Sequence, residues 1–204
     1  MATLTHEDAV TALTLDTSYP EQIGWFKSYM SRTPIDRNDQ PLPWYTYAAS
    51  YFIGARLTKD MQVYEFGAGF STRWYAARTK SVISVEHNQK WIQIKIGDKL
   101  PANAELHILE EGPYAKDILQ YSNKFDIVCV DGIERVNCSL NIMGAIKDDG
   151  VVVWDNSNSS AYAEGYKFLA SHGFRRIDFH GFIPICLGAG CTSVFYRPNN
   201  VFNI

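Results

Sequence analysis

The sequence has no run of five or more basic residues and only a small charge imbalance. Its 19 Lys and Arg residues stand against 22 Asp and Glu residues, which gives a formal net charge of −3. Proteins that bind nucleic acid rely on a concentrated positive surface. The composition therefore argues against a nucleic-acid partner.

Long apolar stretches are also missing. No window approaches the roughly 18 apolar residues of a membrane-spanning helix, and the start, M-A-T-L-T-H-E-D-A-V, has no basic segment followed by an apolar one. We therefore expect a cytoplasmic protein with no membrane partner. The oligomeric state stays open, with a homodimer as one option.

The four cysteines, Cys129, Cys138, Cys186 and Cys191, lack C-x-x-C spacing. This argues against a short redox or zinc motif. Free thiols in a reducing compartment are the expectation, although Cys186 and Cys191 could pair if the segment between them folds back.

From residue 60 onward, short runs rich in β-branched and aromatic residues alternate with helix-compatible segments. This pattern predicts an α/β fold, a doubly wound and mostly parallel sheet with helices on both faces. Parallel strands are predicted at residues 61–66, 81–86, 105–109, 125–131 and 150–156. Two further runs, 175–180 and 192–197, are joined by a segment too short for a crossover helix, which predicts an antiparallel hairpin at the end of the sheet.

Helices are predicted in the connections, at residues 71–78, 91–96, 137–146 and 162–169, with K-D-D-G as a turn before the fifth strand. Residues 1–60 contain two helical pieces, 21–30 and 43–57, separated by a polar, proline-bearing loop. We predict that residues 1–60 form a helical cap on the same domain as residues 61–204.

The stretch V-Y-E-F-G-A-G-F-S-T at 63–72 combines a strand with a Gly-x-Gly turn at Gly67 and Gly69. Such a turn lets the backbone approach a ligand closely. The third glycine of a dinucleotide fingerprint would fall at Thr72, which counts against NAD. Glu65 would repel a pyrophosphate but attract the ammonium group of an amino-acid-bearing ligand, which favours S-adenosylmethionine.

Glu86 ends the second predicted strand, nineteen residues after Gly67. A carboxylate at this position can accept hydrogen bonds from both ribose hydroxyls of an adenosine ligand, in NAD and in S-adenosylmethionine alike. His87 follows, and two interpretations stay open for it: its ring packs on the adenine, or it is a half-exposed loop histidine.

Asp131 ends the fourth predicted strand, and Asp155 and Asn156 end the fifth. Because the carboxyl ends of parallel strands share one edge, these side chains are expected near the ligand. Their three oxygens suit a cation such as Mg²⁺. In the alternative interpretation, Asp131 orients loops or touches the cofactor, while Asp155 and Asn156 cap the next segment.

The motifs E-F-G-A-G-F-S-T, S-V-E-H, F-D-I-V-C-V-D-G and G-V-V-V-W-D-N, in this order, resemble the class I S-adenosylmethionine-dependent methyltransferases. P-W-Y-T-Y and D-G-I-E-R-V-N-C resemble a group of bacterial methyltransferases of unassigned substrate. The resemblance implies a seven-stranded sheet of order 3-2-1-4-5-7-6 with the last strand antiparallel. It also implies cofactor-binding roles for Glu65, Gly67, Ala68, Gly69, Ser71, Glu86, His87 and Asp131.

Asp131 with Asp155 and Asn156 is also similar to the arrangement in catechol and caffeoyl-CoA O-methyltransferases, where the equivalent positions bind a divalent cation. That family has a lysine base three residues after the first aspartate, but this chain has Glu134 there. Glu134 is a candidate base, Asp131 a second catalytic candidate, and Arg135 a candidate to position an anionic substrate. A surface salt bridge between Glu134 and Arg135 is the competing interpretation.

The substrate pocket is expected under P-L-P-W-Y-T-Y and the hairpin loop, with Trp44, Tyr45, Tyr47 and Phe182 as an aromatic lining. The competing interpretation places these aromatics in the core. Transfer of a methyl group to a small-molecule hydroxyl, with or without Mg²⁺, is the function that this pattern favours. An NAD(P)-dependent oxidoreductase and a cofactor-binding module without catalysis are the alternatives.

Overall fold

The computed structural model describes residues 4–97 and 100–204. Its centre is a seven-stranded sheet of order β3-β2-β1-β4-β5-β7-β6. The strands are β1 (Gln62–Phe66), β2 (Ser81–Glu86), β3 (Ala104–Ile108), β4 (Phe125–Val130), β5 (Ile146–Asp155), β6 (Arg175–Phe182) and β7 (Ala189–Tyr196). Strand β7 runs antiparallel to its neighbours β5 and β6, and the other strand pairs of the described sheet are parallel. The predicted fold class and strand order are confirmed.

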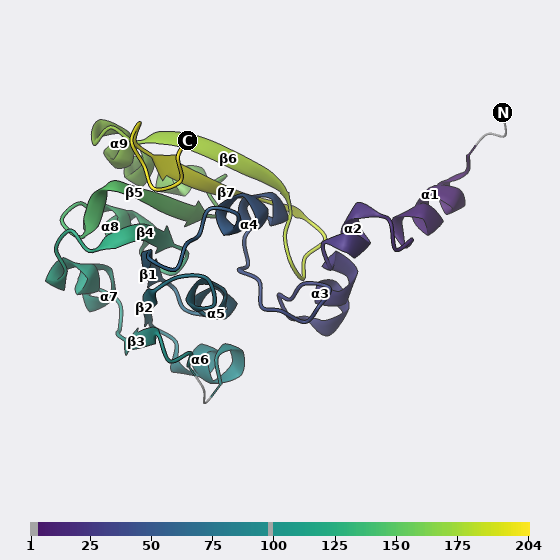
Figure 1. The fold of residues 1–204 in the computed structure, drawn as a ribbon, viewed down its shortest axis with the longest axis horizontal. Coiled ribbons are helices and arrows are strands. Elements are labelled where there is room, and N and C mark those ends of the chain that lie inside the picture. The colour runs from purple at the N-terminus through teal and green to yellow at the C-terminus, as the bar shows by residue number, and fades with distance from the viewer. Residues whose placement is uncertain (1–3, 98–99) are drawn as a thin grey trace.

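Helices cover both faces of this sheet (Figure 1). The helices are α1 (His6–Leu13), α2 (Tyr19–Gln22), α3 (Trp25–Ser31), α4 (Tyr47–Gly54), α5 (Phe70–Ala76), α6 (Gln89–Lys95), α7 (Pro113–Lys116), α8 (Arg135–Leu140) and α9 (Ala163–Ser171). Helices α4, α5 and α6 lie on one face, and α7, α8 and α9 lie on the other. Within the described ranges, no helix is both long and apolar enough to cross a membrane.

Two large apolar cores and a small one, formed by Ala68, Ile92 and Ile96 near α6, hold these layers to the sheet. Along β1, Tyr64 and Phe66 pack into the core beneath α7, α8 and α9, whereas Val63 packs into the core beneath α4 and α5. This alternation follows from strand geometry, because successive side chains point to opposite faces. Since both faces are covered, β4 is buried along its whole length.

Several predicted element boundaries were wrong. The helical piece predicted at 21–30 is two helices, α2 and α3, with Gly24 in the left-handed conformation (φ 76°) between them. The helix predicted at 43–57 begins only at Tyr47, because Thr46 caps it by accepting a hydrogen bond from the N–H of Ala49 (3.3 Å). The helix predicted at 137–146 ends at Leu140. The K-D-D-G turn instead belongs to β5, whose first residue, Ile146, pairs with Phe125 of β4.

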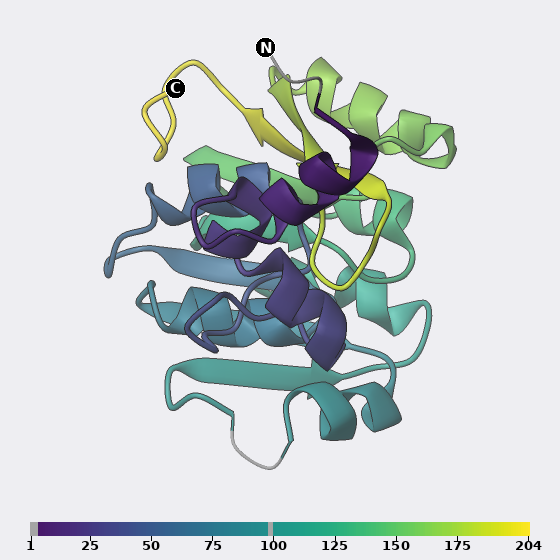
Figure 2. The same cartoon turned by 90° about the vertical axis from the view of Figure 1, so that its right-hand side faces the viewer.

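The N-terminal 60 residues contribute separate pieces. Helix α4 lies against the sheet near β6, and α3 lies beside the loop between β6 and β7 (Figures 1 and 2). Trp25 of α3 donates a hydrogen bond from Nε1 to the carbonyl of Cys186 in that loop (3.0 Å). Helix α1, which the sequence patterns did not predict, projects away from the sheet.

Candidate functional site

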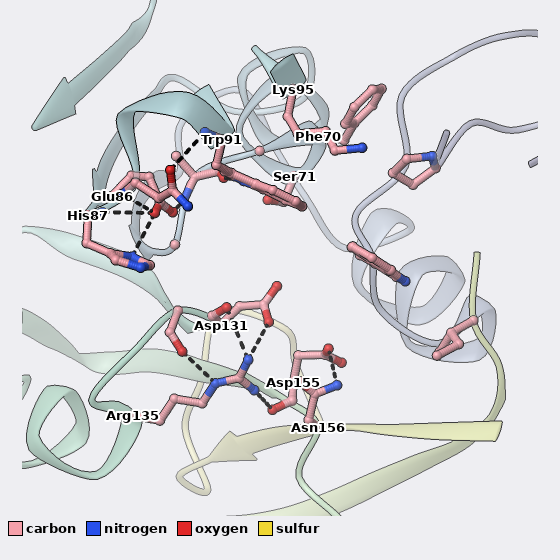
Figure 3. A pocket seen from close by; sticks show the side chains of 18 of the residues that line it. Phe70, Ser71, Glu86, His87, Trp91, Lys95, Asp131, Arg135, Asp155 and Asn156 are labelled. Atoms are coloured by element: carbon pink, nitrogen blue, oxygen red, sulfur yellow. Dashed lines mark hydrogen bonds and ion pairs between the residues drawn. The ribbon is translucent and has the colours of Figure 1, made fainter. Parts of the chain in front are cut away.

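A cavity of about 460 Å³ opens at the carboxyl ends of β1, β2, β4 and β5 (Figure 3). It lies where the strand order reverses, which is the usual ligand crevice of doubly wound sheets. Its lining consists of Pro34, Trp44, Gly67, Ala68, Gly69, Phe70, Ser71, Glu86, His87, Asn88, Trp91, Lys95, Asp131, Gly132, Arg135, Asp155, Asn156, Ile183 and Cys186. Many of the residues predicted from strand ends are therefore brought together here.

The glycine turn after β1 forms one wall of the cavity. Gly67 has φ +99°, and a side chain there would place its Cβ 2.9 Å from the backbone of Asp131 and Gly132. Glycine is therefore required for the turns after β1 and β4 to touch. At Gly69, by contrast, a Cβ would meet only Trp91 Nε1, at 3.7 Å. The surrounding protein atoms therefore leave space beside Gly69.

Glu65 lies behind this turn and is fully buried. Its Oε2 accepts hydrogen bonds from the hydroxyls of Thr72 (2.6 Å) and Ser84 (2.8 Å), while Oε1 has no partner among the described residues. Burial raises the pKa of Glu65 to about 7, against the lowering effect of the hydroxyls of Ser71, Thr72 and Ser84. Glu65 is thus close to the cavity wall without being part of the lining.

Glu86, at the end of β2, is a rigidly held acceptor in the lining (Figure 3). The N–H groups of His87 (2.9 Å) and Asn88 (2.8 Å) donate to Oε1, and the N–H of Ala68 donates to Oε2 (3.2 Å). His87 Nδ1 lies 2.8 Å from Oε1. Among the described residues, Oε2 therefore has a single donor, and it keeps acceptor capacity for a ligand.

Asp131, Arg135 and Asp155 form a charged cluster on the opposite side of the cavity (Figure 3). Arg135 donates from Nη2 to Asp131 Oδ1 (3.2 Å), from Nε to the carbonyl of Gly132 (2.9 Å) and from Nη1 to the carbonyl of Asp155. Thr192 donates to Asp155 Oδ1 (2.5 Å). Arg135 therefore ties the ends of β4 and β5 together.

Both carboxyl groups of this cluster have raised pKa values. Burial is the main cause for Asp131, and the neighbouring Asp155 raises its pKa further, while Arg135 lowers it. Burial raises the pKa of Asp155 to about 6, against the lowering effect of the Thr192 hydrogen bond and of Arg135. Each carboxylate is therefore a better proton acceptor than an exposed one.

The geometry does not support the predicted Mg²⁺ site of Asp131, Asp155 and Asn156. Among the residues that the structure describes, no group of three or more His, Cys, Asp or Glu side chains is arranged to hold a metal. The Arg135 guanidinium contacts both strand ends instead, and the Asn156 amide donates to Asp155 Oδ2 (2.9 Å). A fixed cation of the protein thus balances charge that a metal would otherwise balance.

Comparisons with known proteins agree on the architecture. No family model matches the sequence, and no curated protein matches it. A methyltransferase from Geobacter sulfurreducens superposes with a TM-score of 0.55 at 12% identity, covering 96% of this chain and 97% of that one. A Streptococcus mutans protein in complex with SAH (S-adenosylhomocysteine) gives 0.52 at 12% identity over 72% and 94% of the two chains.

Spermidine synthase from Thermotoga maritima gives a TM-score of 0.55 at 14% identity over 72% of this chain. This chain spans only 56% of the length of that enzyme. The fold is that of the class I methyltransferases. At such identities the likeness concerns the fold, which hosts more than one chemistry.

Several predicted site residues lie outside the cavity of this methyltransferase fold. Glu134 accepts hydrogen bonds from the N–H of Gly112 (2.8 Å) and from Asn137 (3.1 Å), and it does not line the cavity. Tyr45 is buried in the core beneath α4. Tyr47 lines a different groove, and Phe182 is 43% exposed and packs against Trp25. Of the predicted aromatic lining, only Trp44 faces the cavity.

Sequence reasoning missed a second aromatic wall of the methyltransferase-fold cavity. Trp91 of α6 donates from Nε1 to the carbonyl of Ala68 (2.8 Å), and its ring is stacked with that of Trp44 at 6.3 Å between centroids. Ile183 and Cys186 of the β6–β7 loop complete the roof that was predicted for that loop. One feature of the sequence could have indicated this role for Trp91: the segment W-I-Q-I-K-I follows shortly after Glu86, which ends the second strand at the ligand edge.

Proposed function

We propose that this protein is an S-adenosylmethionine-dependent methyltransferase that acts on a small-molecule acceptor. The observation that carries the proposal is the Glu86 carboxylate, held by three backbone N–H groups within a cavity that also contains the Gly67–Gly69 turn. A fixed carboxylate at the end of the second strand suits the two hydroxyls of a ribose. The cavity volume of about 460 Å³ is in the range of small-ligand sites.

The residues near the glycine turn fit the amino-acid end of this cofactor. Glu65 Oε1 is a buried carboxylate oxygen without a partner among the described residues, and an unpaired buried polar atom is costly. Glu65 does not line the cavity, so an ammonium group bound there would act on it through a bridging water and would lower its raised pKa. The open space at Gly69 leaves room for the ligand to approach the backbone.

When bound, S-adenosylmethionine supplies a methyl group that its sulfonium has already activated. The protein's task is then to align the acceptor and to take up its proton. We assign the proton to the Asp131 and Asp155 carboxyl pair, since both line the cavity and both have raised pKa values. Glu134 is not assigned, because it does not line the cavity.

A hydroxyl is the acceptor that this pair suits best, because a carboxylate can accept the O–H hydrogen bond and then the proton. Asp155→Asn should lower kcat by about 100-fold or more while leaving the affinity for SAH nearly unchanged. If Asp155→Asn keeps full activity, the carboxyl pair is not the proton acceptor. The assignment of S-adenosylmethionine as the cofactor would not be affected by that result.

An NAD(P)-dependent oxidoreductase is the weaker alternative. The N–H of Gly69, which a pyrophosphate would need, already donates to Thr72 Oγ1 (3.1 Å). The fully buried Thr72 also fills the position of the third glycine in the dinucleotide fingerprint.

Incubation with methyl-labelled S-adenosylmethionine and a library of hydroxylated and amine compounds tests the proposal. We expect label in a hydroxylated product, formation of SAH, and loss of both in Glu86→Gln. Label only in amines would reject the hydroxyl acceptor. Tight SAH binding without turnover on any compound would favour a cofactor-binding module instead.

A further inference from the structure

Helix α1 is a well-formed amphipathic helix whose side chains are exposed. Its start is capped reciprocally: Thr5 N donates to Asp8 Oδ2 (2.8 Å), and Asp8 N donates to Thr5 Oγ1 (3.1 Å). Yet within the described part of the chain none of its residues is buried, and Val10 and Leu13 are 48% and 52% exposed. A helix of this length is marginal on its own, so packing of its apolar side would stabilise it.

The segment 14–18 directs α1 away from the body (Figure 1). Ser18 donates from Oγ to the carbonyl of Leu13 (2.6 Å) and from N to the carbonyl of Leu15 (2.8 Å). Thr14 donates from Oγ1 to the carbonyl of Thr11 (2.9 Å). These bonds fix the connection to α2, and within the described residues the apolar side chains of α1 stay unburied.

A second cavity, of about 1100 Å³, forms a groove between α2, α4 and β6. Its lining shares no residue with the cofactor cavity. We call it the α4 groove. Its lining includes Ile23, Leu42, Tyr47, Tyr51, Trp74 and Phe179. Its surface is thus mainly apolar and aromatic.

Arginines give the α4 groove a positive rim. The guanidinium of Arg56 lies 3.7 Å from the ring centre of Phe52, and that of Arg78 lies 4.8 Å from the ring centre of Trp74. Arg37 adds a third positive charge. Asp36 is the one acidic residue in the lining, and its Oδ1 accepts hydrogen bonds from the N–H groups of residues 38 and 40.

The N-terminal segment has the complementary charge. The first 26 residues contain four acidic residues, Glu7, Asp8, Asp16 and Glu21, and no Lys or Arg. An acidic amphipathic helix therefore faces outward on the same chain that carries an apolar groove with a basic rim. Helix-in-groove binding uses this combination of an apolar face and complementary charge.

We propose that α1 of one copy docks in the α4 groove of a second copy, and that two copies exchange α1 reciprocally in a two-fold dimer. Val10 and Leu13 pack on the aromatic floor of the groove, while the acidic side chains of α1 meet its arginines. In a two-fold dimer each contact between α1 and the α4 groove occurs twice. The dimer is therefore held by two such interfaces, although each helix is short.

Light scattering coupled to gel filtration, over a concentration series of the full chain, tests the proposal. We expect twice the mass of one chain. Val10→Glu combined with Leu13→Glu should raise the dissociation constant by about 10,000-fold, since each dimer loses four apolar contacts that contribute about tenfold each. Tyr51→Glu, at a groove side chain that is 84% exposed, should also yield a monomer.

A double variant elsewhere on the surface is the matched control. Leu119→Glu with Leu140→Glu adds the same charge at exposed apolar positions outside α1 and the α4 groove, and it should remain dimeric. Far-ultraviolet circular dichroism and melting curves check that each variant is folded. Mixing the α1 variant with Tyr51→Glu should restore a weaker dimer, because one α1 and one intact groove still match. A monomeric full chain, or a dimer that survives both variants, would overturn the proposal.

Discussion

Thr72 Oγ1 donates a 2.6 Å hydrogen bond to Glu65 Oε2, and this contact joins the start of α5 to β1. The same hydroxyl accepts the N–H of Gly69 (3.1 Å). The residue that replaces the third glycine of a dinucleotide motif is therefore an anchor for a buried carboxylate. We infer that the turn is specialised for a ligand with a cationic end rather than for a pyrophosphate.

Removing this hydroxyl should destabilise the protein. Thr72→Val keeps the branched shape but leaves the N–H of Gly69 without its acceptor and removes one of the donors to Glu65, which should cost about 1–3 kcal/mol of unfolding free energy. Urea denaturation measures the loss. Thr72→Ser, which retains the hydroxyl, is the control and should lose clearly less. Equal losses in both variants would mean that packing, not hydrogen bonding, is the role of Thr72.

Stability should depend on pH through Glu65. Its pKa is about 7 in the folded protein against an ordinary value of 4.5, so between these values the folded state binds more protons than the unfolded chain. The free energy of unfolding therefore falls as pH rises through this window, by about 3 kcal/mol from this group. Urea denaturation across the window should show a steeper fall for the natural protein than for Glu65→Gln. Parallel curves would contradict the raised pKa.

The two glycines of the turn should respond differently to alanine. Gly67→Ala combines a positive φ with a contact of 2.9 Å to backbone, so it should cost about 1–3 kcal/mol of stability. Gly69→Ala meets only Trp91 Nε1 at 3.7 Å, so it should leave the melting temperature nearly unchanged and weaken SAH binding. If Gly69→Ala binds SAH as tightly as the natural protein, the ligand does not approach this backbone.

The strand ends were the predictable part of the site. Glu86, Asp131 and Asp155 line one cavity because parallel strands of a doubly wound sheet end at a shared edge, and the apolar runs already located those ends. Glycine spacing likewise located the turn at Gly67. These predictions needed only the positions of the apolar strand runs along the chain and the parallel arrangement of the strands.

The rest of the site depends on tertiary contacts that no local pattern encodes. Trp44 lines the cavity whereas its neighbour Tyr45 is buried in the core, and the next residue, Thr46, is held by a hydrogen bond from its N–H to Thr192 Oγ1 (3.0 Å). That contact joins residues 146 positions apart. Cys186 reaches the cavity on a loop held by Trp25, which is 161 positions away in the sequence.

Arg135 should be essential for stability. Arg135→Ala removes the cation beside Asp131 and three donors to the carbonyls of Asp131, Gly132 and Asp155, which should cost roughly 3–5 kcal/mol in urea denaturation. Arg135→Lys restores the charge but not the planar fork of donors, so we expect an intermediate loss. An alanine variant as stable as the natural protein would show that the cluster needs no cation.

Catalysis should be independent of added metal. Because Arg135 already balances the charge of the strand ends, we expect the methyl-transfer rate to be the same with and without excess EDTA. A rate that falls on chelation and returns with Mg²⁺ would reinstate the catechol-type arrangement of Asp131, Asp155 and Asn156.

Calorimetric titration of the protein with SAH tests the central claim most directly. We predict one site per chain, with the dissociation constant raised about 10-fold to 100-fold in Glu86→Gln, because a charged hydrogen-bond acceptor contributes about 1.5–3 kcal/mol. Glu111→Gln, at an exposed glutamate outside the cavity, should bind like the natural protein. The absence of both binding heat and a melting shift at millimolar SAH would contradict the assignment of this cavity to S-adenosylmethionine.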